Sequence, residues 1–110
     1  MIKLSYRGKD YYLEYNRAAI RKLEEADFNI NAINTKPAKM IPLLFYGAFL
    51  KNHKDMTQSK ANEIYSKVVN KINDDDLGLI GALMEEYSKV VNEMFDEPED
   101  EGNGAVWTVV

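Results

Sequence analysis

The stretch MIPLLFYGAFL, residues 40–50, is an apolar block inside an otherwise charged chain of 110 residues. It holds no charged side chain, and Lys39 and Lys51 flank it. The block is much shorter than the roughly 20 apolar residues that a membrane-spanning helix needs. A helix that is apolar on almost every face lies in the centre of a fold or is contacted by a partner. The block therefore predicts a helix that is buried or faces a partner, and the sequence leaves both interpretations open.

Two prolines determine where this helix can begin. Proline is tolerated in the first turn of a helix, whereas inside a helix it removes a hydrogen bond. A helix that begins at Lys36 accepts Pro37 in its first turn but is kinked at Pro42. A helix that begins near Met40 has Pro42 in its opening turn. We favour the later start, near Met40.

The first 15 residues predict a β-hairpin. Apolar and polar residues alternate over residues 2–6 and again over residues 11–15, so each segment presents one apolar face. Residues 7–10 are expected to form a tight turn, in which Gly8 supplies a positive φ. The dipeptide Gly8-Lys9 fits a type II′ turn.

The rest of the chain up to Phe95 predicts helices. Asn16 is expected to cap a first short helix that ends near Ala26, and Thr57 to cap a third helix after the apolar block. Residues 27–35 are rich in asparagine and are expected to form an ordered loop, anchored on the core by apolar side chains. The acidic residues 74–76 favour the start of a fourth helix. Its long apolar stripe comprises Leu79, Ile80, Leu83, Met84, Tyr87, Val90, Val91, Met94 and Phe95.

The composition changes abruptly after Phe95. Residues 96–104, DEPEDEGNG, are too charged to pack and predict a flexible linker. The chain ends in the β-prone hexamer AVWTVV, which holds the only tryptophan, Trp107. We therefore predict an α+β, mostly α fold: one domain over residues 1–95, with an N-terminal β-hairpin followed by about four helices. Residues 96–110 are predicted to be an acidic flexible linker and a short apolar tail, which is mobile or added as a strand.

Composition argues against several classes of function. The chain has 14 Lys and Arg against 18 Asp and Glu, a net charge of −4, and no basic stretch dense enough for nucleic acid. It has no cysteine, which excludes disulfides and thiolate metal sites and suits a reducing cytoplasm. The N-terminus lacks the apolar run of a signal peptide. We expect a cytoplasmic protein with no nucleic-acid or membrane partner.

No pattern in the chain is typical of an active site. His53 is the only histidine, and no nucleophile motif accompanies it, so we expect it to complement a helix dipole. The acidic run 96–101 lacks the spacing of a calcium-binding loop and is expected to be a solvated linker. The acidic residues 74–76 have neither a phosphate-binding glycine loop nor a catalytic base nearby and are expected to serve as a helix cap. We predict no enzyme activity, no metal and no cofactor.

Three segments, in this order, resemble a family of phage tail assembly chaperones, small proteins encoded just ahead of the tape-measure protein in long-tailed phages of Gram-positive bacteria. They are the hairpin turn YRGKDY at 6–11 with LEYNR at 13–17, LEEADFNI at 23–30, and MIPLLFYGAFLK at 40–51. The ending GAVWTVV after an acidic linker is also similar to the ends of such proteins. The resemblance covers roughly residues 1–95.

The resemblance implies a role in virion assembly without catalysis. Such a chaperone binds the tape-measure protein and keeps it soluble until the tail tube polymerises around it. It also implies self-association, action in the cytoplasm of the infected bacterium, and absence from the mature virion. A longer frameshifted form would recruit the tail-tube protein.

The apolar block and the tryptophan are the predicted protein-binding residues. A chaperone for amphipathic helices needs an apolar groove or stripe and no catalytic group. Two alternatives remain open: a structural tail or head component that stays in the virion, and a small protein-binding regulatory module. The residues predicted to bind protein are Met40, Leu43, Leu44, Phe45, Phe49, Leu50 and Trp107.

Overall fold

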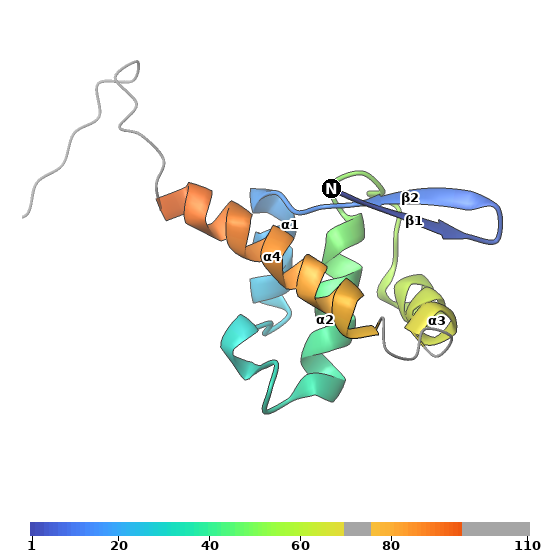
Figure 1. Cartoon of the computed structure of the whole chain (residues 1–110). Helices are drawn as coiled ribbons and strands as arrows, with labels where there is room; N and C mark the ends of the chain where they lie inside the picture. The colour runs from blue at the N-terminus through green and yellow to red at the C-terminus, as the bar shows by residue number, and fades with distance from the viewer. Residues whose placement is uncertain (70–75, 96–110) are drawn as a thin grey trace, which may run out of the picture.

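The fold combines a two-stranded hairpin with four α-helices, as a computed structural model describes it for residues 1–69 and 76–95 (Figure 1). The helix α2 runs through the middle, with α1, α3 and α4 around it. This arrangement confirms the predicted α+β, mostly α fold with an N-terminal hairpin. The elements are β1 (Ile2–Tyr6), β2 (Lys9–Leu13), α1 (Arg17–Glu25), the 3₁₀ turn η1 (Ile30–Ala32), α2 (Pro37–Phe49), α3 (Gln58–Val69) and α4 (Asp76–Phe95).

The hairpin is closed by a two-residue turn. The strands pair antiparallel, from Ile2 opposite Leu13 to Tyr6 opposite Lys9. The turn is therefore Arg7-Gly8, with φ of +50° and +77°. Positive φ at both central residues is the pattern of a type I′ turn, whose twist matches that of the strands. The predicted Gly8-Lys9 type II′ turn is wrong, because Lys9 already belongs to β2, but the positive φ of Gly8 is confirmed.

Two predicted helix caps are confirmed. The Ala19 N–H donates to Asn16 Oδ1 over 2.8 Å at the start of α1, which ends with Ala26 as its C-cap. The Lys60 N–H donates to Thr57 Oγ1 over 3.1 Å at the start of α3. Each side chain satisfies one of the amides that a helix N-terminus leaves without a partner.

The loop between α1 and α2 is ordered, as predicted, and contains the unpredicted turn η1. The Asn31 N–H donates to Asn29 Oδ1 over 2.9 Å, which starts the turn. Phe28 and Ile33 are buried in the core and anchor the loop at both sides of the turn. The side chain of Asn29 thus organises the loop locally, and the apolar residues attach the loop to the core.

The helix α2 begins earlier than predicted. It starts at Pro37, so Pro42 lies inside the helix and the favoured start near Met40 is wrong. The carbonyl of Lys36 accepts from the N–H groups of Lys39 and Met40, over 3.3 and 3.0 Å. The first turn is therefore closed before Pro42 is reached. Pro42 has no backbone N–H and so cannot make the usual helical hydrogen bond. The buried side chains on either side of it, Met40, Leu43 and Leu44, stabilise the helix at this point.

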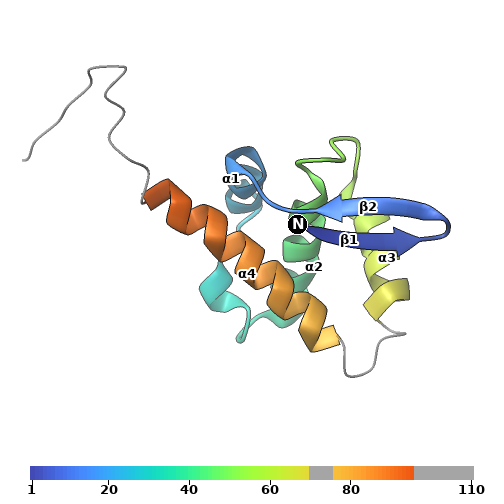
Figure 2. The same cartoon turned by 45° about the horizontal axis from the view of Figure 1, so that its top comes forward.

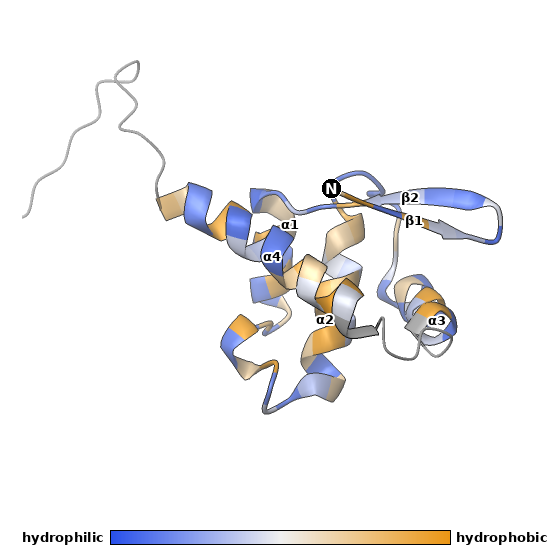
Figure 3. Cartoon of the chain, in the orientation of Figure 1, coloured by the Kyte–Doolittle hydropathy of each residue, from blue (hydrophilic) through white to orange (hydrophobic). Residues whose placement is uncertain are grey.

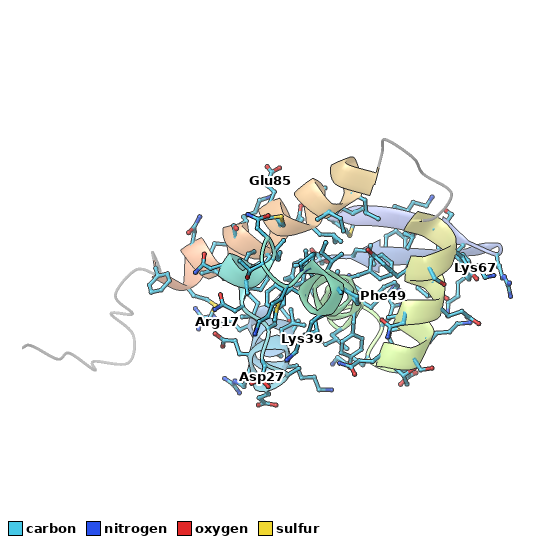
Figure 4. The ribbon with its side chains drawn as sticks, turned by 90° about the horizontal axis from the view of Figure 1, so that it is seen from below. Arg17, Asp27, Lys39, Phe49, Lys67 and Glu85 are labelled. Atoms are coloured by element: carbon cyan, nitrogen blue, oxygen red, sulfur yellow. The ribbon has the colours of Figure 1, made fainter. Side chains whose placement is uncertain are left out.

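The core is built around α2, seen nearly end-on in Figure 4. It packs against α1, α3, α4 and β2. Gly47 lets α1 approach closely, because a Cβ at this position would lie 2.5 Å from Leu23 Cδ1. The buried residues of α2 are Met40, Leu43, Leu44, Phe45, Gly47, Ala48 and Phe49.

Within the described residues, no helix is both long and apolar enough to cross a membrane.

Two of the sequence predictions lie outside the described residues. The acidic residues before α4 fall in or beside the gap at 70–75, and their predicted capping role stays a prediction. The same holds for the acidic linker and the apolar tail at 96–110. The predicted domain boundary after Phe95 is likewise untested.

Candidate functional site

The predicted binding residues of the apolar block lie inside the protein. Phe45 and Phe49 have no exposed surface, and their rings contact each other edge to face, with centroids 5.1 Å apart. Phe45 also contacts Tyr65 of α3, and Phe49 contacts Tyr11 of β2. Met40, Leu43, Leu44 and Leu50 are exposed by 9% or less. A partner cannot contact these six residues in this conformation. The seventh predicted residue, Trp107, lies outside the described residues. The predicted role of all seven in protein binding stays a prediction.

The helix α4 packs on this core most closely through two side chains near its middle. Leu83 is fully buried, and the ring of Tyr87 meets Tyr15 and Phe28 edge to face, with centroids 5.5 and 5.2 Å apart. The Tyr15 hydroxyl donates to the Leu44 carbonyl over 2.6 Å, which connects this aromatic cluster to α2. Burial, followed by the charges of Tyr87 and Glu86, raises the pKa of Tyr15 well above its usual value.

The apolar stripe of α4 is wider than the surface that covers it. With about 100° between successive residues, its nine positions span about 160° of the helix circumference. Only Leu83 and Tyr87, near the middle, are buried. The positions on both sides of these two are covered less completely: five of them pack against the core but keep part of their surface exposed. Figure 3 shows apolar and polar positions alternating along α4. The incompletely covered members are Leu79, Ile80, Met84, Val90 and Val91, which are half-buried, and Met94 and Phe95, which are exposed by 39% and 85%.

One edge of the stripe is bordered by the N-terminus of the chain. The Met1 ammonium lies 3.0 Å from Glu86 Oε1, which also faces Lys89 at 3.7 Å. On the helix circumference, Glu86 lies beyond Leu79 and Val90, so this edge faces the hairpin. The other edge is a row that we call the outer flank of α4, formed by Ile80, Met84, Val91 and Phe95.

A second feature that sequence reasoning missed is the contact of His53 with the hairpin. The Tyr12 N–H donates to His53 Nε2 over 3.0 Å, and Asn52 Nδ2 donates to the Tyr12 carbonyl over the same distance. Burial, and then the charge of Lys9, lowers the pKa of His53. His53 is therefore a neutral hydrogen-bond acceptor and not the predicted cation at a helix end. No local pattern in the chain signals this contact, because its partners are 41 positions apart.

The described residues contain no group of three or more His, Asp and Glu side chains that could hold a metal ion. What they offer instead is apolar surface on α4 and basic surface around α1 and the segment that follows α2. Surface of this kind binds other proteins by shape, apolar contact and charge.

The comparisons with known proteins identify a family for this chain but no individual relative. No curated protein matches the chain, and no solved structure matches it. The model of one family, described as a domain of unknown function (DUF5055), matches residues 1–110. Because the match extends over the whole sequence, the chain belongs to the family of this domain of unknown function, DUF5055.

Proposed function

We propose that this protein is a phage tail assembly chaperone, which binds the tape-measure protein and keeps it soluble until the tail tube polymerises. The observation that carries the proposal is the incompletely covered apolar stripe of α4, above all its outer flank. A stripe of this width on one helix is suited to a second amphipathic helix, which would dock with its own apolar face.

The proposal assigns different roles to α2 and α4. The apolar block in α2 forms the scaffold, since its side chains hold α1, α3 and the hairpin in place. The outer flank of α4 makes the contact with the client. Met84 on this flank is half-buried and can adapt its unbranched side chain to different client residues. The segments at 6–17, 23–30 and 40–51 support the choice of client through their resemblance to tail assembly chaperones.

Co-expression with the tape-measure protein of the same phage tests the proposal. The wild-type chain is expected to bring the tape-measure protein into the soluble fraction and to co-purify with it. The double variant Val91→Ser, Phe95→Ser is expected to lose most of this effect, because it removes apolar surface at the exposed end of the outer flank.

The matched control is Glu85→Ser, Lys89→Ser, which changes two exposed residues on the opposite face of α4. Both double variants should be compared with the wild type in thermal unfolding, so that lost client binding is separated from lost folding. A tape-measure protein that stays insoluble with the wild-type chain contradicts the proposal. So does mass spectrometry that finds this chain in stoichiometric amount in purified virions, since the protein would then be a structural component.

A further inference from the structure

The charge of this chain is strongly divided along its length. Residues 1–69 contain 12 Lys and Arg against 7 Asp and Glu, a net charge of +5. Residues 70–110 contain 2 against 11, a net charge of −9. The overall charge of −4 is therefore the sum of two opposite charges. The basic part, residues 1–69, makes up most of the described structure, and the acidic part is the C-terminal 41 residues. Opposite charges of this size attract each other over about 8–10 Å at ordinary salt.

A first pocket on the basic part lies on α1. Its volume is about 480 Å³, and its lining combines the apolar residues Ala18, Ala19 and Leu50 with the cations Arg21, Lys22 and Lys54. Glu25 is the one acidic residue in its lining. Such a pocket suits a ligand that carries negative charge next to apolar groups.

A second pocket adjoins the first and shares Lys54 with it. This pocket has a volume of about 510 Å³ and lies between β2, the segment after α2 and α3, with Lys9, Lys51 and Lys60 in its lining. Lys51 is paired with Glu14 at 3.2 Å and Lys60 with Glu63 at 2.8 Å. These two lysines are therefore already neutralised by carboxylates.

The remaining cations form what we call the basic face: Lys9, Arg21, Lys22 and Lys54. Among the described residues, none of these four has a carboxylate oxygen within 4.0 Å. Lys9 lies over the ring of Tyr11, 5.1 Å from its centroid, and its charge contributes to lowering the pKa of His53. The face thus offers several cations without a carboxylate partner within 4.0 Å in the described structure, although Glu25 lies in the lining of the first pocket and Asp55 in that of the second.

The end of α4 lies on the same side of the molecule as α1. In Figures 1 and 2 the C-terminal end of α4 lies beside α1. The acidic residues 96–101 follow directly in the sequence. Six residues in extended conformation span up to about 20 Å, which is sufficient to follow the surface of one helix.

We infer that the basic face binds the acidic segment 96–101 of the same molecule. The carboxylates of this segment are the partners of Arg21, Lys22 and Lys54 at the first pocket, and Lys9 extends the positive surface beyond it. This contact is separate from the outer flank of α4 and does not depend on the identity of the client.

Zero-length cross-linking of the full chain tests this inference, because a carbodiimide joins a lysine to a carboxylate only when the two are in contact. In low salt, peptide mass spectrometry is expected to find residues 96–101 joined to Lys22 and Lys54 at least several-fold more often than to Lys36 and Lys39. These control lysines are also exposed but lie at the start of α2. The preference should disappear in about 1 M salt, where charges are screened within about 3 Å.

An equal mixture of ¹⁴N and ¹⁵N protein identifies the source of the segment. Cross-links within molecules of one isotope only support the inference, whereas cross-links between isotopes assign the segment to a second copy and overturn it. Equal cross-linking of all four lysines overturns it as well.

A variant with residues 96–101 neutralised as D96N, E97Q, E99Q, D100N and E101Q provides a second readout that needs no cross-linker. Amide NMR shifts of residues 18–22 and 52–55 are expected to differ from the wild type, with those of residues 36–41 unchanged. Unchanged shifts in all three regions contradict the inference.

Discussion

The helices α2 and α4 are both rich in apolar residues, yet they differ in how completely these residues are buried. The 13-residue α2 buries seven of its residues and touches three helices and a strand. The 20-residue α4 buries only Leu83 and Tyr87 among the side chains described in it, and the helices on which it mainly packs are α1 and α2. Apolar content alone therefore does not decide burial in this protein. Position in the fold does, because a small domain can surround one helix and not two.

The contrast also bears on function. The apolar surface of an enclosed helix stabilises the fold and is not accessible to a partner. The exposed part of an apolar stripe can bind one. The protein-binding surface thus belongs on the helix that packs less completely. The following predictions test whether α2 is core and α4 is surface.

The largest expected effect separates two phenylalanines. Phe45→Ala in α2 removes a ring with no exposed surface and is expected to lower the free energy of unfolding by about 3–5 kcal/mol. Phe95→Ala at the end of α4 removes a ring that is 85% exposed and should change it by no more than about 0.5 kcal/mol. Urea unfolding followed by circular dichroism measures both. Similar losses in the two variants would mean that Phe95 is also part of the core.

A smaller effect, of opposite sign in the two helices, is expected at two glycines. Gly47→Ala in α2 places a methyl group 2.5–2.8 Å from buried Leu23, and overpacking of this kind costs about 1–3 kcal/mol. The gain of about 1 kcal/mol in helix propensity offsets only part of this cost. Gly81→Ala in α4 meets no atom within 4 Å and should stabilise the protein by about 0.5–1 kcal/mol. Thermal unfolding of the two variants checks the signs, and stabilisation by Gly47→Ala would show that the α1–α2 contact is looser than described.

The smallest effect concerns the segment after α2, where His53 accepts the Tyr12 amide. Unfolded chains protonate histidine near pH 6.5, whereas burial and Lys9 lower the pKa of His53 in the folded protein. The unfolded state therefore binds more protons between these two values, so the free energy of unfolding should fall as the pH falls below about 6.5. Urea midpoints between pH 7.5 and 5.5 measure this effect.

His53→Gln is the matched control for this pH dependence. Glutamine can still accept from the Tyr12 amide but does not titrate, so its urea midpoint should vary less over this pH range. The carboxylates of Asp10, Glu14 and Glu63 have a lowered pKa and titrate below this range. Equal slopes for the wild type and His53→Gln would contradict the role given to His53.

Local patterns predicted most of the fold, because they depend on neighbouring residues. Alternation predicted two strands, although the second begins at Lys9 and not at Tyr11, and Asn16 and Thr57 cap helices through bonds to amides three residues on. The type of hairpin turn and the start of α2 were predicted wrongly. Both depend on small energetic differences between neighbouring registers, which strand pairing and core packing decide.

Local sequence patterns were sufficient to predict two strands and four helices, their order and the residues that are apolar enough to bury, but not the turn η1 or the start of α2. Which apolar helix is enclosed depends on how the helices pack: the enclosed one is α2, for which the sequence allowed either a buried or a partner-facing position. It also brought His53 to Tyr12, and Lys9 and Lys54 to one pocket, from distant parts of the chain. The physical reason is that periodicity is set by bonds within a few residues, whereas burial and charge clustering arise only when distant segments pack together.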